Sequence, residues 1–327
     1  MNNFQWIEAQ SVDEALAGHV KGAAFKAGGI DLVDLMKDHL AAPPRLVNIR
    51  NIKALKFVYS DGEGLKLGPL TTLAELAEHP VVKLQWRALS LAAGHAATPQ
   101  VRNMATVGGN LLQRPRCWYF RNENYHCRKK GGEICYAQSG ENQYHAIFHN
   151  ALCAIVHPSA TACALVAHHA KLELTSSKGK REVLLEEFLT LPSVELHREN
   201  SIGEDEIITQ IRVPATPPGS SSAYIKQGQK ESFDWPLAEV AVVLAKDTSG
   251  KCKEASIVLG AAAPVPYRVP AAEEKLKGAV IDEDIAHQAA EVAMKGATPL
   301  SHNAYKVPIF KTIIARTILM ANQGGAA

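Results

Sequence analysis

Short alternations of apolar and polar residues in the first part of the chain predict strands and helices in turn. Ser11-Val12-Asp13-Glu14 has the form of a capping box, in which a hydroxyl and a carboxylate close the first turn of a helix. Strands are expected over residues 23–27 and 46–49, with a helix between them that Asp31 caps and that runs to about Lys37. These elements predict a small β-α-β-α-β unit at the N-terminus.

The next apolar runs predict a hairpin followed by helix. Residues 55–59 and 65–67 flank Asp61-Gly62-Glu63-Gly64, a sequence that favours a tight turn between antiparallel strands. Thr72-Leu73-Ala74-Glu75 is a second capping box, and a helix is expected over residues 82–93.

Residues 111–150 show no hydrophobic periodicity. A structureless stretch of this length is uncommon in a compact domain unless something organises it. Strands are expected to resume at 154–156, 171–175 and 206–213.

Thr216-Pro217-Pro218-Gly219-Ser220-Ser221-Ser222 is the clearest linker signal in the chain. Beyond it the pattern predicts a run of strands and then a run of helices, an order typical of an α+β domain. The strands are expected at 223–227, 238–245 and 255–259, and the helices at 271–276, 285–294 and 306–319.

Composition narrows the class of protein. The chain has 327 residues, 46% of them hydrophobic, and a formal net charge of +2. This charge gives no nucleic-acid footprint, and no apolar run is long enough to span a membrane. The N-terminal residues have neither a basic start nor an apolar signal core, so we expect no export signal in this chain.

Two glycine pairs stand in apolar runs. One lies in Lys26-Ala27-Gly28-Gly29-Ile30-Asp31 and the other in Ala105-Thr106-Val107-Gly108-Gly109-Asn110. Each is either a tight turn or a place where the backbone approaches a phosphate. Neither has the Gly-x-Gly-x-x-Gly spacing of a Rossmann dinucleotide site, so that class is disfavoured.

The two pairs, in this order and separation, resemble the FAD-binding subunits of molybdenum hydroxylases, the family of xanthine dehydrogenase and carbon monoxide dehydrogenase. The resemblance extends over nearly the whole chain, including His157-Pro158-Ser159. It implies an α+β fold with a two-part FAD-binding domain of the PCMH type over residues 1–218, in subdomains of about 1–54 and 55–218. A smaller C-terminal domain, like that of the carbon monoxide dehydrogenase flavoprotein, is implied over residues 219–327.

The resemblance also implies the residues that contact FAD. The two glycine loops hold the pyrophosphate, Thr106 and Asn110 add polar contacts, an isoleucine packs on the ring, and a lysine reaches the polar edge of the flavin. The implied set is Lys26, Ala27, Gly28, Gly29, Ile30, Asp31, Leu32, Thr106, Gly108, Gly109, Asn110, Ser159, Ile207, Ile208 and Lys226.

Three qualifications belong to this set. Lys226 is alternatively a solvated strand lysine. The family usually has Ser-Asp where this chain has Ser159-Ala160, so a carboxylate near the flavin is missing. Covalent relatives carry a histidine in the first glycine loop, and this chain has none there, so the FAD is expected to be non-covalent.

Trp235, which follows Asp234, is either a flavin or partner contact or a packing residue.

Four of the six cysteines lie close together at Cys117, Cys127, Cys135 and Cys153. In a large chain without a signal, such grouping favours metal binding over disulfides, but the spacing does not fit a zinc ribbon. Within the family, a cysteine-bearing insertion occurs in 4-hydroxybenzoyl-CoA reductase and in the bacterial periplasmic aldehyde oxidoreductase, and residues 114–120 look most like the latter. The resemblance implies an insertion at about 112–153 that holds one [4Fe–4S] cluster; buried or zinc-binding cysteines are the alternative.

The remaining candidates have ordinary interpretations. Cys163 is expected in the core, and Cys252 is expected to be incidental. His126, His145 and His149 flank the cysteines and are each interpreted as ordinary histidines, although any of them is able to donate to a ligand.

The resulting expectation is an electron-transfer subunit with FAD and one [4Fe–4S] cluster in a molybdenum-dependent aldehyde oxidoreductase. Its partners are a large subunit with the molybdenum cofactor, a small [2Fe–2S] subunit and an external electron acceptor, with no nucleic acid and no membrane span. The alternatives are a self-contained flavin oxidoreductase and a non-catalytic iron–sulfur or zinc scaffold. The compartment is periplasmic, by export with a signal-bearing partner, or cytoplasmic.

Overall fold

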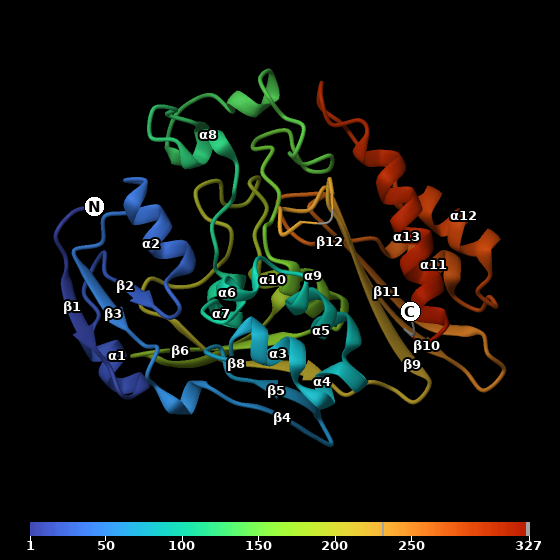
Figure 1. The fold of residues 1–327 in the computed structure, drawn as a ribbon, viewed down its shortest axis with the longest axis horizontal. Coiled ribbons are helices and arrows are strands. Elements are labelled where there is room, and N and C mark those ends of the chain that lie inside the picture. Colours follow the sequence, from blue (N-terminus) through green and yellow to red (C-terminus); the bar gives the residue numbers. More distant parts are fainter. Residues whose placement is uncertain (231, 325–327) are drawn as a thin grey trace.

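A computed structural model describes residues 1–230 and 232–324. Its N-terminal part is a three-stranded parallel sheet of β1 (Gln5–Glu8), β3 (Arg45–Asn48) and β2 (Ala24–Lys26), in that order. Helices α1 (Val12–Gly18) and α2 (Ile30–Lys37) connect the strands, and this unit is blue in Figure 1. The predicted β-α-β-α-β unit is therefore confirmed.

A five-stranded sheet follows, with strand order β4-β5-β8-β6-β7 and antiparallel pairing throughout. Its inner face shares one buried apolar core with a group of short helices. The strands are β4 (Val58–Asp61), β5 (Gly64–Leu67), β6 (Lys171–Ser176), β7 (Gly179–Leu184) and β8 (Ile207–Pro214). The helices around them are α3 (Leu73–Glu78), α4 (Pro80–Gln85), α5 (Arg87–Gly94), α9 (Ala160–Ala167) and α10 (Leu185–Phe188).

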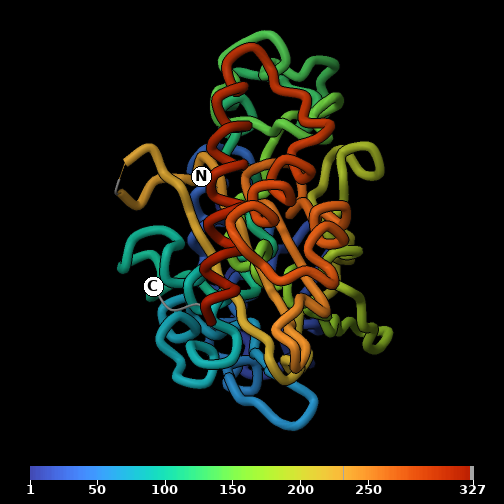
Figure 2. Tube along the Cα trace, turned by 90° about the vertical axis from the view of Figure 1, so that its right-hand side faces the viewer, coloured from blue at the N-terminus to red at the C-terminus, as the bar shows by residue number. Residues whose placement is uncertain are grey.

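The third sheet has the order β12-β11-β10-β9 and is also antiparallel. Three helices form a separate apolar core with it, and Figure 2 shows them covering one face of the sheet. Helix α5 contacts β9, and helix α9 contacts β10 and β11, so the second and third sheets are joined through these helices. The elements are β9 (Ser220–Gln227), β10 (Ala238–Lys246), β11 (Cys252–Gly260), β12 (Tyr267–Arg268), α11 (Pro270–Leu276), α12 (Glu283–Ala293) and α13 (Lys306–Asn322).

The segment between α7 (Val107–Leu111) and α9, which we call the cysteine insertion (residues 112–153), lies at the top of Figure 1 in green. It contains helix α8 (Trp118–Arg121) and 3₁₀ turns at Arg128–Lys130 and Tyr136–Gln138, and no strand is assigned to it. Its lack of periodicity in the sequence corresponds to a lack of regular structure.

Several sequence expectations are wrong in detail. Helix α2 begins at Ile30, and its N-cap is Gly29, which has φ of 82° and supplies no side chain. Asp31 therefore does not cap the helix, and its carboxylate has other partners. The expected helix over 82–93 is two helices, because the backbone leaves the helical region at Trp86 (φ −124°, ψ 52°), whose side chain is buried in the core.

Three further differences concern segments that the sequence left without helix or assigned to a short strand. The strand expected at 154–156 is absent, because the backbone there bonds singly to distant segments, as in Ala146 N to Ala154 O at 2.9 Å, and joins no ladder. The second glycine pair is not a loop but lies inside α7, with Thr106 as N-cap. The linker is shorter than expected, because β9 already begins at Ser220. Both capping boxes begin helices, and that of Thr72 and Glu75 is complete.

Candidate functional site

A cavity of about 790 Å³ lies between the two glycine pairs, β8 and the β9–β10 loop. It is lined by Gly28, Gly29, Thr106 and Asn110 at one end and by Lys226 at another. All of the predicted FAD-contacting residues except Ser159 line it. A deep, largely apolar cavity with a few polar groups is typical of a cofactor site.

The first glycine loop, from Lys26 to Leu32, lies against the residues that directly precede the second glycine pair. A Cβ on Gly28 would lie 2.1 Å from the carbonyl oxygen of Met104, so only glycine permits this approach. Within residues 1–230 and 232–324, the backbone N–H groups of Gly28, Gly29, Ile30 and Asp31 donate no hydrogen bond. The start of α2 therefore offers several donors and the positive end of a helix dipole to the cavity, a combination that binds anions.

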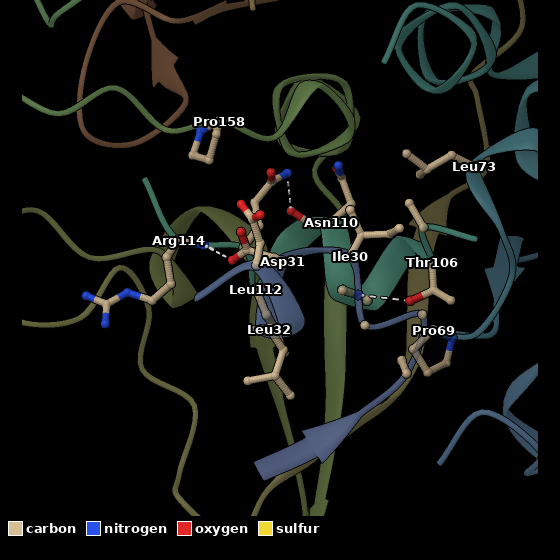
Figure 3. Close-up of a pocket in the computed structure, with 18 of the residues that line it drawn as sticks. Ile30, Asp31, Leu32, Pro69, Leu73, Thr106, Asn110, Leu112, Arg114 and Pro158 are labelled. Carbon is tan, nitrogen blue, oxygen red and sulfur yellow. Dashed lines mark hydrogen bonds between the residues drawn. The ribbon is translucent and has the colours of Figure 1, made fainter. Parts of the chain in front are cut away.

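The second glycine pair is built differently. The N–H groups of Val107 and Gly108 donate to the carbonyl oxygens of Thr71 and Pro69, each at 2.9 Å. Gly109 N–H donates to the hydroxyl of Thr106 at 3.2 Å. The backbone N–H groups of this pair thus already have acceptors within the protein. Its glycines contribute to the cavity by leaving space for a ligand to come close to the backbone, not by donating hydrogen bonds. Figure 3 shows Ile30 and Asp31, at the start of α2, near Thr106 and Asn110.

Asn110 supplies the polar group that the second pair lacks. Its Oδ1 accepts hydrogen bonds from the Ser159 hydroxyl at 2.6 Å and from the Thr161 hydroxyl at 2.5 Å. Because both hydroxyls donate to the oxygen, the amide NH₂ group remains as the donor of a side chain that lines the cavity. Ser159 also caps α9 by accepting from Ala162 N–H, so it acts on the site through Asn110. Ala160 contributes no polar side chain between them.

The paired strands β9 and β10 contribute Lys226 and Glu239 to the cavity wall. Lys226 of β9 lies directly across from Glu239 of β10, and Tyr224 donates to Glu239 Oε1 at 2.7 Å. Burial raises the pKa of Glu239 to about 7, and burial lowers the pKa of Lys226, whose ammonium donates to His95 O at 3.0 Å. Lys226 is thus a partly buried cation at the cavity and not a solvated strand lysine.

Aliphatic and aromatic side chains complete the cavity wall. Ile207 and Ile208, both buried, come from β8. Phe233 and Trp235 stand at the rim, and the guanidinium of Arg116 lies 4.9 Å from the Trp235 ring centre. The Asp-Trp pair signalled these contacts in the sequence, whereas Glu239 and Arg116 carried no local signal and were missed.

Two residues that were predicted to contact FAD have side chains that interact with other parts of the protein. Lys26 extends over the Trp6 ring, 5.4 Å from its centre, and donates to Asn48 Oδ1 at 3.4 Å. The carboxylate of Asp31 accepts from Arg114 N–H at 2.7 Å and pairs with Arg116 and Arg121, all in the cysteine insertion. The backbone of both residues, rather than these side-chain groups, is what the first loop presents.

The four clustered cysteines converge on a second, small cavity of about 10 Å³. Cys117, Cys127, Cys135 and Cys153 all line it. Burial raises the pKa of Cys117 to about 12, while a hydrogen bond from Cys153 lowers the pKa of Cys135 to about 6. Over the part of the chain that the structure describes, no group of three or more His, Cys, Asp or Glu side chains has the arrangement of a metal-ion site.

Polar groups surround this second cavity. His145 Nε2 lies 3.2 Å from Cys117 Sγ, so this histidine contacts one of the four cysteines. Burial lowers the pKa of His145 to about 4, which keeps the ring neutral. Lys129, 1% exposed, pairs with Glu199 at 2.7 Å, and Glu199 also pairs with Arg114 at 2.8 Å. Cys163 and Cys252 are buried in the two main cores, away from this cavity.

No helix among the described residues is long and apolar enough to cross a membrane.

Comparison with known proteins places the chain. Residues 2–216 match the FAD binding domain in molybdopterin dehydrogenase, and residues 223–321 match the CO dehydrogenase flavoprotein C-terminal domain. The chain is 32% identical to the aldehyde oxidoreductase FAD-binding subunit PaoB of Escherichia coli K12, over 98% of this chain and 99% of the relative. It is 28% identical to the carbon monoxide dehydrogenase medium chain of Hydrogenophaga pseudoflava, over 90% of this chain and 88% of that one.

The fold agrees with these matches. The solved carbon monoxide dehydrogenase of Hydrogenophaga pseudoflava that lacks the Mo-pyranopterin moiety superimposes with a TM-score of 0.75 at 26% identity, over 98% of this chain and 97% of that chain. The α+β expectation and the two-part architecture inferred from the glycine pairs are confirmed. The chain belongs to the family of FAD-binding subunits of molybdenum hydroxylases, which are oxidoreductase subunits.

Proposed function

We propose that this chain is the electron-transferring FAD subunit of a molybdenum-dependent aldehyde oxidoreductase. The observation that carries the proposal is the cavity of about 790 Å³ bounded by both glycine pairs, with unpaired backbone N–H groups on one side. The 32% identity to an aldehyde oxidoreductase subunit over almost the full chain supports the choice of substrate class. Bound FAD exchanges electrons in single or paired steps, which suits a subunit between one-electron carriers and an acceptor.

The first glycine loop is proposed to bind the pyrophosphate. The N–H groups of Gly28, Gly29 and Ile30 are free to donate, and the dipole of α2 favours a negative charge at the same place. Gly109 allows close approach from the other side, since its Cβ position has only the Thr106 hydroxyl within 4 Å, at 3.1 Å. The Asn110 amide adds a donor that Ser159 and Thr161 orient.

Strand β8 and the paired strands β9 and β10 are proposed to contact the flavin ring. Ile207 and Ile208 offer apolar surface, and Lys226 offers a cation near the polar edge, where positive charge favours a reduced, anionic ring. Glu239 holds a proton on its buried carboxyl up to about pH 7. No side chain of the first loop is a histidine, which supports non-covalent binding.

We propose that Cys117, Cys127, Cys135 and Cys153 hold one [4Fe–4S] cluster. Four thiols facing one cavity is the donor set that such clusters use. Arg128 and Lys129 line the same cavity, and the charge of Lys129 favours the thiolate form of Cys153. The cavity of about 10 Å³ has room for one water-sized body, so cluster binding requires the insertion side chains to move outward.

The assembly follows from this role. We propose a large partner with the molybdenum cofactor, a small partner with [2Fe–2S] clusters and an external electron acceptor. We also propose two domains. The first, of about 1–218, contains the first two sheets and has subdomains at about 1–54 and 55–218. The second, 219–327, contains the third sheet. The compartment stays a prediction: periplasmic by export with a signal-bearing partner, or cytoplasmic.

Flavin and metal analysis of the full chain, alone and in the native complex, tests the proposal. We expect one FAD per chain in both, iron without stoichiometric zinc, and aldehyde turnover only in the complex. Turnover by the chain alone would favour a self-contained flavin oxidoreductase. An absorbance spectrum without flavin bands, from a chain offered FAD, would favour a scaffold.

A further inference from the structure

The carboxylate of Asp31 is taken up by the cysteine insertion rather than by its own helix. Oδ2 accepts the backbone N–H of Arg114 at 2.7 Å, and Oδ1 accepts from the guanidinium groups of Arg116 and of Arg121, the latter at 2.7 Å. The Asp31 side chain is 14% exposed. Three donors from one short segment thus converge on the first turn of α2. Hydrogen bonds to a charged carboxylate are stronger than neutral ones, so these contacts hold the two segments together firmly.

Arg116 extends the connection to the second glycine pair. Besides Asp31, it donates to Gln113 Oε1 at 3.1 Å, and Gln113 Nε2 donates to Asn110 O at 2.9 Å. Gln113 is buried. A single guanidinium thus joins both walls of the flavin cavity to the cysteine insertion.

Apolar packing reinforces the same junction. Leu35 of α2 forms a small buried cluster with Phe120 and Cys127 of the insertion, and Cys117 and Tyr136 pack at its edge. Helix α2 therefore has its first turn at the flavin cavity and one side against residues next to the cysteine cavity. The insertion has few ladder hydrogen bonds of its own, so contacts such as these hold its shape.

We propose, on the basis of the function proposed above, that Asp31 is a positioning residue that couples order in the cysteine insertion to binding at the first glycine loop. The coupling needs no cofactor in the cysteine cavity, because every contact that carries it belongs to this chain. By thermodynamic linkage it is reciprocal: whatever fixes the insertion tightens flavin binding, and flavin binding slows opening of the insertion.

Two substitutions interrupt the coupling from opposite sides. Asp31→Asn removes the charge at the glycine loop. Arg121→Gln removes one partner from the insertion, and Arg121 does not line the flavin cavity. Asp38→Asn makes the same chemical change as Asp31→Asn at the exposed end of the same helix and is the matched control.

Amide hydrogen exchange of the full chain, with and without saturating FAD, reads out the coupling directly. In the unchanged chain we expect FAD to slow exchange both at residues 26–33 and at residues 114–136. In Arg121→Gln and Asp31→Asn we expect protection of 26–33 to persist and protection of 114–136 to fall about tenfold, with FAD affinity lowered about tenfold. Asp38→Asn is expected to behave like the unchanged chain.

The outcomes separate this inference from the proposed function. FAD that protects neither segment of the unchanged chain overturns the proposed flavin site itself. FAD that protects both segments equally in Arg121→Gln overturns the coupling while leaving the flavin site intact. If Asp31→Asn fails to fold, Arg121→Gln alone decides, since its side chain contacts the insertion side of the junction.

Discussion

The cavity between the glycine pairs, which we call the flavin cavity because FAD is proposed to bind there, and the cysteine insertion are stabilised in different ways. At the flavin cavity, regular elements and backbone geometry do the work: Gly29 begins α2 in a left-handed conformation, and Gly28 approaches Met104 where no Cβ fits. In the insertion, side chains hold the backbone: Arg128 donates to the carbonyl oxygens of Glu133 and Leu152, and Lys129 is paired inside with Glu199.

This difference separates two kinds of vulnerability. A site made from backbone is sensitive to added volume at its glycines. A segment made from buried ion pairs is sensitive to the loss of any single charge, because the remaining partner stays buried without compensation. The predictions below change one kind of interaction at a time.

The largest effect is expected from Glu199→Gln, because Glu199 pairs with Lys129 and Arg114 of the cysteine insertion. The substitution leaves the ammonium of Lys129, 1% exposed, without its counter-charge, which costs about 3 kcal/mol of unfolding free energy. The matched control is Glu78→Gln, whose pair with Lys83 is largely exposed and is worth less than about 1 kcal/mol. Urea unfolding of both variants measures the difference; equal small losses would mean that the buried pair does not support the insertion.

A smaller effect is expected from Glu239→Gln, and it depends on pH. Burial raises the pKa of Glu239 from 4.5 to about 7, so the folded state holds this proton more tightly than the unfolded state. The corresponding stability is present below about pH 4.5 and is lost as the pH rises to about 7. Relative to the unchanged chain, Glu239→Gln should therefore gain about 2 kcal/mol between pH 5 and pH 8.

The comparison cancels titration of groups remote from Glu239. The difference still includes the response of Lys306, whose pKa burial lowers to about 7 and the charge of Glu239 raises. Unfolding curves at both pH values give the result. A stability difference that stays constant between pH 5 and pH 8 would contradict the buried, proton-holding carboxyl.

The smallest effect is expected from Thr161→Val. It removes one of the two hydroxyls that donate to Asn110 Oδ1 and keeps the shape of the side chain. Loss of one hydrogen bond costs about 1 kcal/mol, so FAD affinity should fall about fivefold. Thr209→Val, whose hydroxyl bonds to Glu173 away from the cavity, is the control in a fluorescence titration with FAD. Equal affinities for the two variants would show that orientation of Asn110 does not matter.

Local sequence signals predicted most of the fold, and the family resemblance named residues that line one cavity in the structure. The first β-α-β-α-β unit and the capping box of Thr72 follow from short-range patterns, which neighbouring residues alone determine. The fate of Asp31 was not predictable this way, because its partners lie more than 80 residues along the chain. The same reason hides Glu239 and Arg116, whose roles arise only where strands and loops from distant segments meet.

The second glycine pair shows a subtler limit. Its sequence suggests N–H groups aimed at a phosphate, but Pro69 and Thr71 accept the donors of Gly108 and Val107. Only the tertiary arrangement reveals that these donors are spent and that the cavity side of Gly109 is what stays open.

The central claim is that FAD lies between the glycine pairs, and the FAD content of Gly109→Val after gel filtration tests it most directly. A Cβ at Gly109 lies 3.1 Å from the Thr106 hydroxyl, a tight contact that a small shift of this side chain relieves, so the chain is expected to fold, as circular dichroism would verify. Gly62→Val, in an open hairpin turn, is the control. We predict about one FAD per chain for the unchanged protein and for Gly62→Val, and less than about a tenth of that for Gly109→Val. Full FAD retention by folded Gly109→Val would contradict the claim.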